Sequence, residues 1–118
     1  MQFEELESWQ MARQLVSGVY RLTRDDALVR DFGVASQIQR AAVSIMSNVA
    51  EGFERRHVPE KLQAYNIARA SAGEVRSLLY VIVDNYPSTA HSANALFPQV
   101  QSVGKLISGL IASTEARR

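Results

Sequence analysis

The chain has 118 residues, a formal net charge of +1 and no cysteine. This length suits one domain with its own hydrophobic core, and the lack of cysteine excludes a disulfide framework and a Cys-ligated zinc site. The nearly neutral charge differs from the strongly basic composition that is typical of nucleic-acid-binding domains.

The N-terminal residues MQFEELESWQ are acidic and lack the apolar stretch of a signal peptide. No run of about 18 apolar residues occurs, so we expect no transmembrane helix and no membrane partner. We therefore predict a cytoplasmic protein in which residues 1–118 form a single domain.

The first helix is predicted at about residues 5–23. Its apolar residues recur at steps of three and four, which is the period of a helix with one buried face. They are Leu6, Trp9, Ala12, Val16, Val19 and Tyr20.

A second helix is predicted at about residues 36–56, because Ser36 and Gln39 can form a capping box at its start. Pro59 disfavours a helical conformation at the residue before it and suits the first turn of a helix. A third helix is therefore predicted at about residues 59–85.

The fourth helix is predicted at about residues 89–115. Pro98 lies inside it and cannot donate a hydrogen bond to the Asn94 carbonyl, so we expect a kink or a late start. The outer side of this helix is small and nearly uncharged. Either a neighbouring subunit covers that side, or it is an ordinary exposed face rich in Ser and Gln. Its residues are Ser92, Gln99, Gln101, Ser102, Gly104, Ser108 and Ala112.

Four amphipathic helices with short connections and no strand pattern predict an all-α fold, namely an antiparallel up-down four-helix bundle. Gly18, Gly73, Gly104 and Gly109 fall within the predicted helices. Glycine lowers helix stability, so we expect it to permit close approach of helices, within one chain or between subunits.

Polar residues at steps of four and three line the second helix beside its apolar residues. We interpret them, with polar residues of the third helix, as a seam that fixes the register of the two helices. The residues of this predicted polar seam are Ser44, Asn48, Glu51, Arg69, Ser71 and Glu74. We expect Asn48 and Glu51 to face the third helix, and Arg69 to pair with Glu51 or Glu74.

The polar row contains neither histidine nor cysteine, so it lacks a nucleophile–base pair and no enzyme is predicted. Glu54 and His57 have the Glu-x-x-His spacing of di-iron bundles. Such a site needs a second Glu-x-x-His and two further glutamates, which the chain does not supply, so no metal or cofactor is expected.

Basic residues gather at the second connection, at Arg55, Arg56 and Lys61, and Arg40 lies one face of the helix away. They are the candidate contacts for RNA or DNA, because a ring of subunits would repeat them and bind phosphates by multivalency. The flanking Glu54 and Glu60 partly cancel their charge, and a solvated basic turn is the alternative.

Two segments carry a resemblance, SQIQRAAVSIMSNVAEGFERR and YNIARASAGEVRSLL. The chain resembles the 23S rRNA intervening-sequence protein family of four-helix bundle proteins, from Trp9 to VGKLISGLI near the end. This resemblance implies a four-helix bundle, a homopentameric ring and a largely undefined activity. It also implies a relation to the accessory variability determinant proteins of diversity-generating retroelements, which bind nucleic acid. From the residues and the resemblance together, we predict a non-enzymatic, oligomeric scaffold protein, with nucleic-acid binding as the alternative.

Overall fold

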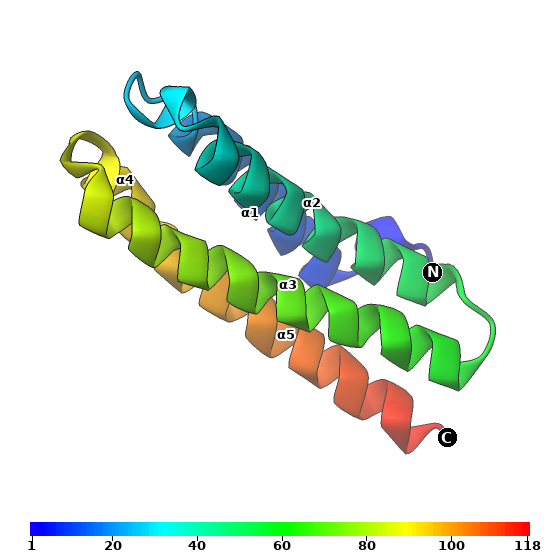
Figure 1. Cartoon of the computed structure of the whole chain (residues 1–118). Coiled ribbons are helices and arrows are strands. Elements are labelled where there is room, and N and C mark those ends of the chain that lie inside the picture. Colours follow the sequence, from blue (N-terminus) through cyan, green and yellow to red (C-terminus); the bar gives the residue numbers. More distant parts are fainter.

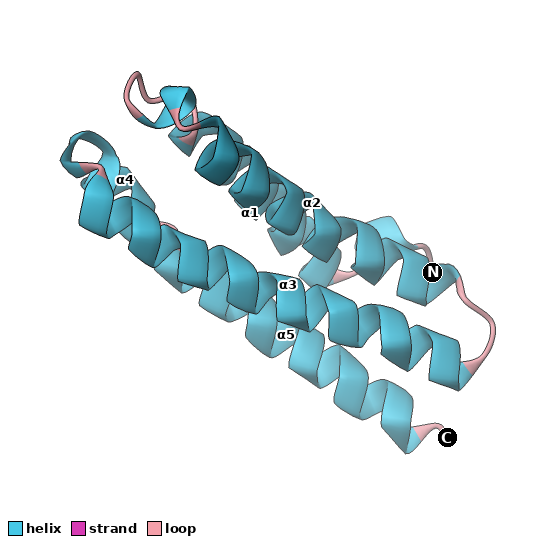
Figure 2. Ribbon diagram, viewed as in Figure 1, coloured by secondary structure: helices cyan, strands magenta, loops and turns pink.

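Four long α-helices pack side by side in the computed structural model, which describes residues 1–118 (Figure 1). They are α1 (Glu7–Leu22), α2 (Phe32–Glu54), α3 (Val58–Asn85) and α5 (Phe97–Ala116). Short helical turns complete the chain: η1 (Phe3–Glu5), η2 (Leu28–Arg30), η3 (Pro87–Thr89) and α4 (Ala90–Asn94). Figure 2 shows helices and loops without a strand, which confirms the predicted all-α helical bundle.

The bundle is elongated, with principal extents of 47 × 21 × 20 Å. Figure 1 shows the chain running along this long axis in alternating directions through α1, α2, α3 and α5. Each long helix packs against two others, in the pairs α1–α2, α2–α3, α3–α5 and α1–α5. No helix is both long and apolar enough to cross a bilayer.

The core consists of the apolar faces that the helical spacing indicates. Its largest fully buried side chains come from all four long helices and from η2. They are Tyr65, Leu15, Leu28, Ile38, Ile45, Leu79, Ile82, Ile107, Val19, Val49, Val75 and Val103.

The start of α2 differs from the prediction. The helix begins at Phe32, and Asp31 caps it by accepting a hydrogen bond from the Val34 amide at 3.2 Å. Ser36 therefore lies inside the helix, and the capping box of Ser36 with Gln39 was the wrong start. Gly33, a residue type common in turns, lies in the first turn of this helix and does not adopt a positive φ.

The predicted fourth helix is two helices. α4 ends at Asn94, and α5 starts at Phe97 with Pro98 in its first turn. The Leu96 amide bonds to Ala93 and the Val100 amide to Leu96, each at 3.0 Å. Pro98 has no amide hydrogen to donate to a carbonyl of the preceding turn. This explains the late start of α5 that was expected from the sequence.

Two hydrogen bonds join the α1–α2 connection to the segment after α3 at one end of the bundle. The Tyr86 hydroxyl donates to Asp31 Oδ2 at 2.5 Å, and the Ser88 hydroxyl donates to Asp25 Oδ2 at 3.1 Å. The hydrogen bond from Tyr86, and then that from the Val34 amide, lower the pKa of the Asp31 carboxyl. The same pairing with Asp31 is the main reason that the pKa of the Tyr86 hydroxyl is raised.

Candidate functional site

Polar contacts between α2 and α3 occur where the sequence predicts a seam. The hydroxyls of Ser44 and Ser71 form a hydrogen bond of 2.9 Å, and Ser71 is buried. Gln37, which the sequence interpretation did not include, donates its amide to Glu74 Oε2 at 3.3 Å. These two bonds connect α2 with α3, and their role in fixing register stays a prediction.

Other members of the predicted seam do not cross between the helices. Asn48 Nδ2 donates to the Ser44 carbonyl at 2.9 Å and to the Ser44 hydroxyl at 3.2 Å, both within α2. Asn48 thus reaches Ser71 only through Ser44, because a side chain four residues away on the same helix is the nearer partner.

The predicted pairing of Arg69 with Glu51 or Glu74 is wrong. Arg69 donates to Asn66 Oδ1 at 3.2 Å on its own helix. Glu51 is exposed and pairs with Arg55. In both cases the observed partner lies three or four residues away in the same segment of the chain.

Arg55 is held by two carboxylates at the α2–α3 turn. Its guanidinium lies 2.8 Å from Glu51 Oε1 and 3.4 Å from Glu60 Oε2. The hydrogen bond that Arg55 donates to Glu51 and the charges of both glutamates raise the pKa of Arg55. A phosphate would therefore have to compete with two carboxylates for this guanidinium.

Lys61 is also engaged within the chain. Its Nζ donates to the carbonyls of Phe53 at 2.8 Å and Gly52 at 3.2 Å. These carbonyls lie in the last turn of α2, so Lys61 caps this helix from the neighbouring one. Partial burial and then the charge of Arg117 lower the pKa of the Lys61 ammonium.

Arg40 and Arg56 are exposed and form no ion pair. Arg40 precedes Arg55 by fifteen residues on α2, which places it about 22 Å along the helix. The structure therefore brings Arg55, Arg56 and Lys61 together at the turn and leaves Arg40 apart from them. Of the three residues at the turn, only Arg56 has a side chain without a partner in the chain.

Glu54 and His57 lie at the end of α2 and just before α3, and both are exposed. The structure contains no group of three or more His, Asp, Glu or Cys side chains that could hold a metal ion.

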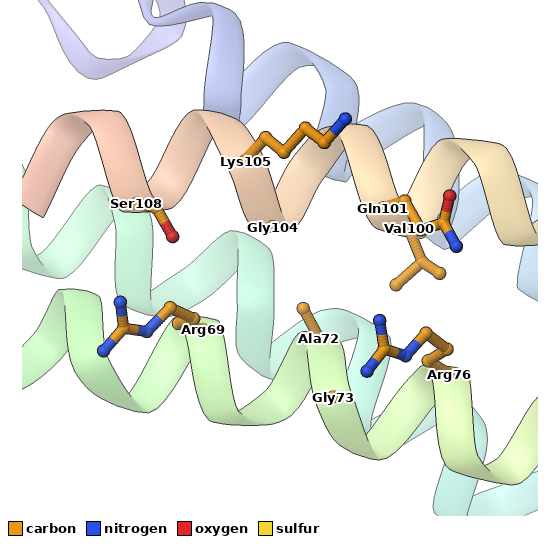
Figure 3. Close-up of a pocket in the computed structure, with 9 residues that line it drawn as sticks. All are labelled: Arg69, Ala72, Gly73, Arg76, Val100, Gln101, Gly104, Lys105 and Ser108. Carbon is orange, nitrogen blue, oxygen red and sulfur yellow. The ribbon is translucent and has the colours of Figure 1, made fainter.

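A different basic site lies between α3 and α5, where the helices border an open groove of about 500 Å³ (Figure 3). We call it the α3–α5 groove. Three cationic side chains line it and no carboxylate does. Its residues are Arg69, Ala72, Gly73, Arg76, Val100, Gln101, Gly104, Lys105 and Ser108.

Small residues separate the cations of this groove. Figure 3 shows Arg69 and Arg76 projecting from α3 on either side of Ala72 and Gly73, while Ser108 points from α5 toward α3. A Cβ atom added at Gly73 or Gly104 would meet no atom within 4 Å. The groove is therefore open to solvent at the positions where a side chain would normally cover it.

The cations of the α3–α5 groove form no ion pair in the chain. Arg76 and Lys105 donate no side-chain hydrogen bond, and Arg69 bonds only to Asn66. Sequence reasoning did not find this site, because more than one element contributes to it. The available signals were the seven-residue spacing of Arg69 and Arg76 and the lack of acidic residues in the first four turns of α5.

The family model for the 23S rRNA-intervening sequence protein matches residues 4–109, which is nearly the whole chain. The chain belongs to the 23S rRNA-intervening sequence protein family. The predicted family is therefore confirmed, while no curated protein matches the chain. Membership in this family assigns no activity to the residues described above.

Proposed function

We propose that this member of the 23S rRNA-intervening sequence protein family is a non-enzymatic scaffold that assembles with copies of itself in the cytoplasm. The observation that carries the proposal is a set of exposed apolar side chains on α2 and α3. We call this set the α2–α3 outer face: Phe32, Val43, Ile67 and Val81.

The members of the α2–α3 outer face follow the helical period on each helix. Phe32 and Val43 are eleven residues apart on α2, or about three turns. Ile67 and Val81 are fourteen residues apart on α3, or about four turns. Each pair therefore lies on one side of its helix, and α2 and α3 are neighbours in the bundle. Val43 follows Gln39 by one turn, and Gln39 bonds to Thr23 at the end of α1, whereas Ser44 bonds to Ser71 of α3, so the two pairs form separate patches.

The exposure of these side chains is high for apolar residues. Phe32 is 80% exposed and Ile67 is 45% exposed, while Val43 and Val81 are each 38% exposed. A scattered apolar residue on a surface is ordinary, but exposed apolar residues that recur on one side of a helix are compatible with an association surface. Burying them against another subunit would remove apolar area from water and stabilise the assembly.

The assembly that we propose is a homopentameric ring, as the resemblance to the family implies. Rotational symmetry lets each copy use the same surfaces and closes the assembly without an exposed end. The low charge on the outer side of α5, where Ala112 is exposed beyond the groove-lining Gln101 and Ser108, is compatible with a further contact in such a ring.

The test is the mass of the protein in solution, measured by light scattering at micromolar concentration. We expect a mass near that of five chains, and a lower mass for V43K/I67K. The matched control is Y20K, because Tyr20 is 41% exposed on α1 and lies outside the α2–α3 outer face. A wild-type monomer, or an equal loss of mass in the control variant, would overturn the proposal.

Nucleic-acid binding through Arg40, Arg55, Arg56 and Lys61 is the weaker proposal. Its support is the relation to the accessory variability determinant proteins of diversity-generating retroelements that the sequence resemblance implies. Two observations weigh against it: Arg55 is paired with carboxylates, and Lys61 is bonded to carbonyls. Steep salt dependence of RNA or duplex DNA binding, lost in R55A/R56A, would favour this function over the scaffold alone.

A further inference from the structure

We propose that the α3–α5 groove binds an acidic helix of a partner protein, through two carboxylates that lie seven residues apart on that helix. This proposal names the chemistry of a partner, and it rests on the scaffold function proposed above. It uses a different surface from the α2–α3 outer face, so the two can be tested separately.

Charge is the first reason for this choice of partner. Arg69, Arg76 and Lys105 line the groove, all three are exposed, and none has an ion-pair partner in the chain. No Asp or Glu lines the groove. An anionic group entering it would meet guanidinium groups free to form bidentate hydrogen bonds to a carboxylate.

Spacing is the second reason. Arg69 and Arg76 are seven residues apart, which is two helical turns or about 10 Å along α3. Two carboxylates seven residues apart on a packed helix have the same separation, because both helices have the same rise per residue. A helix that lies along the groove can therefore present one carboxylate to each arginine.

The lining of the groove is the third reason. Gly73 and Gly104 lie inside long helices, where glycine is unfavourable, and neither position is crowded by another atom of the chain. Gly18 and Gly52 are different, because a Cβ atom there would collide with Leu96 or Tyr65. Packing within the chain therefore explains Gly18 and Gly52 but not Gly73 and Gly104, which permit close approach of an outside backbone.

A protein helix fits the groove better than nucleic acid does. Three cations neutralise few phosphates, and binding of a polyanion to a chain with a net charge of +1 would be weak at moderate salt. Two guanidiniums separated by small residues suit a ligand with two discrete charges and a narrow, rod-like backbone.

The experiment uses a labelled, alanine-rich helical peptide with two glutamates seven residues apart. Its binding to the full chain is followed by fluorescence anisotropy at low and moderate salt. We expect R69A/R76A to lose about tenfold or more in affinity. The matched control R40A/R56A removes the same charge from two other exposed arginines, and we expect it to change affinity by less than about twofold. The peptide with glutamine in place of both glutamates should also bind about tenfold more weakly.

A second variant tests the shape of the groove without changing its charge. G104L places a side chain in the open space and should weaken peptide binding by about tenfold. Melting temperature and solution mass, recorded for every variant, show whether the bundle and its assembly are intact.

Several results would overturn the proposal. They are absence of peptide binding, equal affinity for the glutamate and glutamine peptides, and equal losses in R69A/R76A and R40A/R56A. Tighter binding of single-stranded RNA or duplex DNA, with the same dependence on Arg69 and Arg76, would assign the groove to phosphates instead. If the peptide does not bind while the protein keeps its oligomeric mass, the groove proposal is overturned and the scaffold function is not. If the wild-type chain is a monomer, the scaffold function is overturned.

Discussion

The α2–α3 turn and the α3–α5 groove both concentrate basic residues, but they use them in opposite ways. At the turn, Arg55 pairs with two glutamates and Lys61 caps α2 through two carbonyls. In the groove, Arg69, Arg76 and Lys105 have no carboxylate beside them. Arg55 and Lys61 at the turn are therefore engaged within the chain, whereas the three cations of the groove, which two different helices bring together, have no ion-pair partner.

The glycines of the turn and the groove also differ in their surroundings. Gly52, at the end of α2, faces the buried ring of Tyr65, and an added Cβ atom would lie 2.5 Å from its Cε1 atom. Gly73 faces open space in the groove. One region is closed by the packing of the chain, and the other is open.

The largest expected effect is that of Gly52→Ala. The new methyl group would force the Tyr65 ring out of the core, and we expect a loss of about 1–3 kcal/mol in the free energy of unfolding. Urea denaturation measures this loss. Gly73→Ala is the control, and it should stabilise the chain by up to about 1 kcal/mol, because alanine favours the helix and has room there. A loss of stability in both variants would contradict the difference between the two regions.

Lys61→Met should have the next largest effect. It keeps the apolar stem but leaves the carbonyls of Gly52 and Phe53 without their donor, which should cost about 1 kcal/mol. Lys105→Met removes the same charge in the groove and should change stability by less than about 0.5 kcal/mol. Equal melting temperatures for the two variants would show that Lys61 is no more engaged than Lys105.

A smaller effect on the free energy of unfolding should follow from a change of pH, because groups that are hydrogen-bonded in the fold have different pKa values in the folded and unfolded states. The pKa of Asp31 is lowered in the fold, so its stabilising contribution is present above pH 3.8 and is lost as pH falls through the lowered pKa. The pKa of Tyr86 is raised, so its contribution is present below pH 10.0 and is lost as pH rises through the raised pKa.

Tyr86→Phe removes this hydrogen bond and provides the test. Urea denaturation from acid to alkaline pH should show the largest difference from the wild type near neutral pH, and a smaller one at both extremes. The matched control is Tyr80→Phe, because the Tyr80 hydroxyl donates no hydrogen bond in the chain. A difference that does not change with pH would contradict the coupling of Asp31 and Tyr86.

The sequence predicts the helical architecture because the apolar residues that recur every three or four positions lie on the buried side of each helix. The sequence-based prediction of helix bounds is wrong where one residue type occurs in two kinds of local structure. Gly33 reads as a turn residue but sits in the first turn of α2, where Asp31 supplies the cap. Pro98 indicates an interruption of the predicted fourth helix. The five-residue α4 before it is too short for an apolar period to show where it begins and ends.

The candidate sites were harder to predict than the fold. Spacing on α2 places Ser44 correctly toward α3, but it does not show whether a polar side chain bonds across helices or back to its own helix, as Asn48 does. Local clustering drew attention to Arg55 and Lys61, whose neighbours in space neutralise or bind them. Arg69, Arg76 and Lys105 required the pairing of α3 with α5, which the sequence does not specify.

The α3–α5 groove is the proposed ligand-binding site of this bundle. Amide NMR spectra of the full chain, recorded during titration with the glutamate peptide, test it most directly, because the glycine amides report separately on the two regions. We predict that the signals of Gly73 and Gly104 shift with peptide concentration while that of Gly52 stays in place. Shifts at Gly52 and Lys61, with Gly73 and Gly104 unchanged, would contradict the claim and return the binding site to the α2–α3 turn.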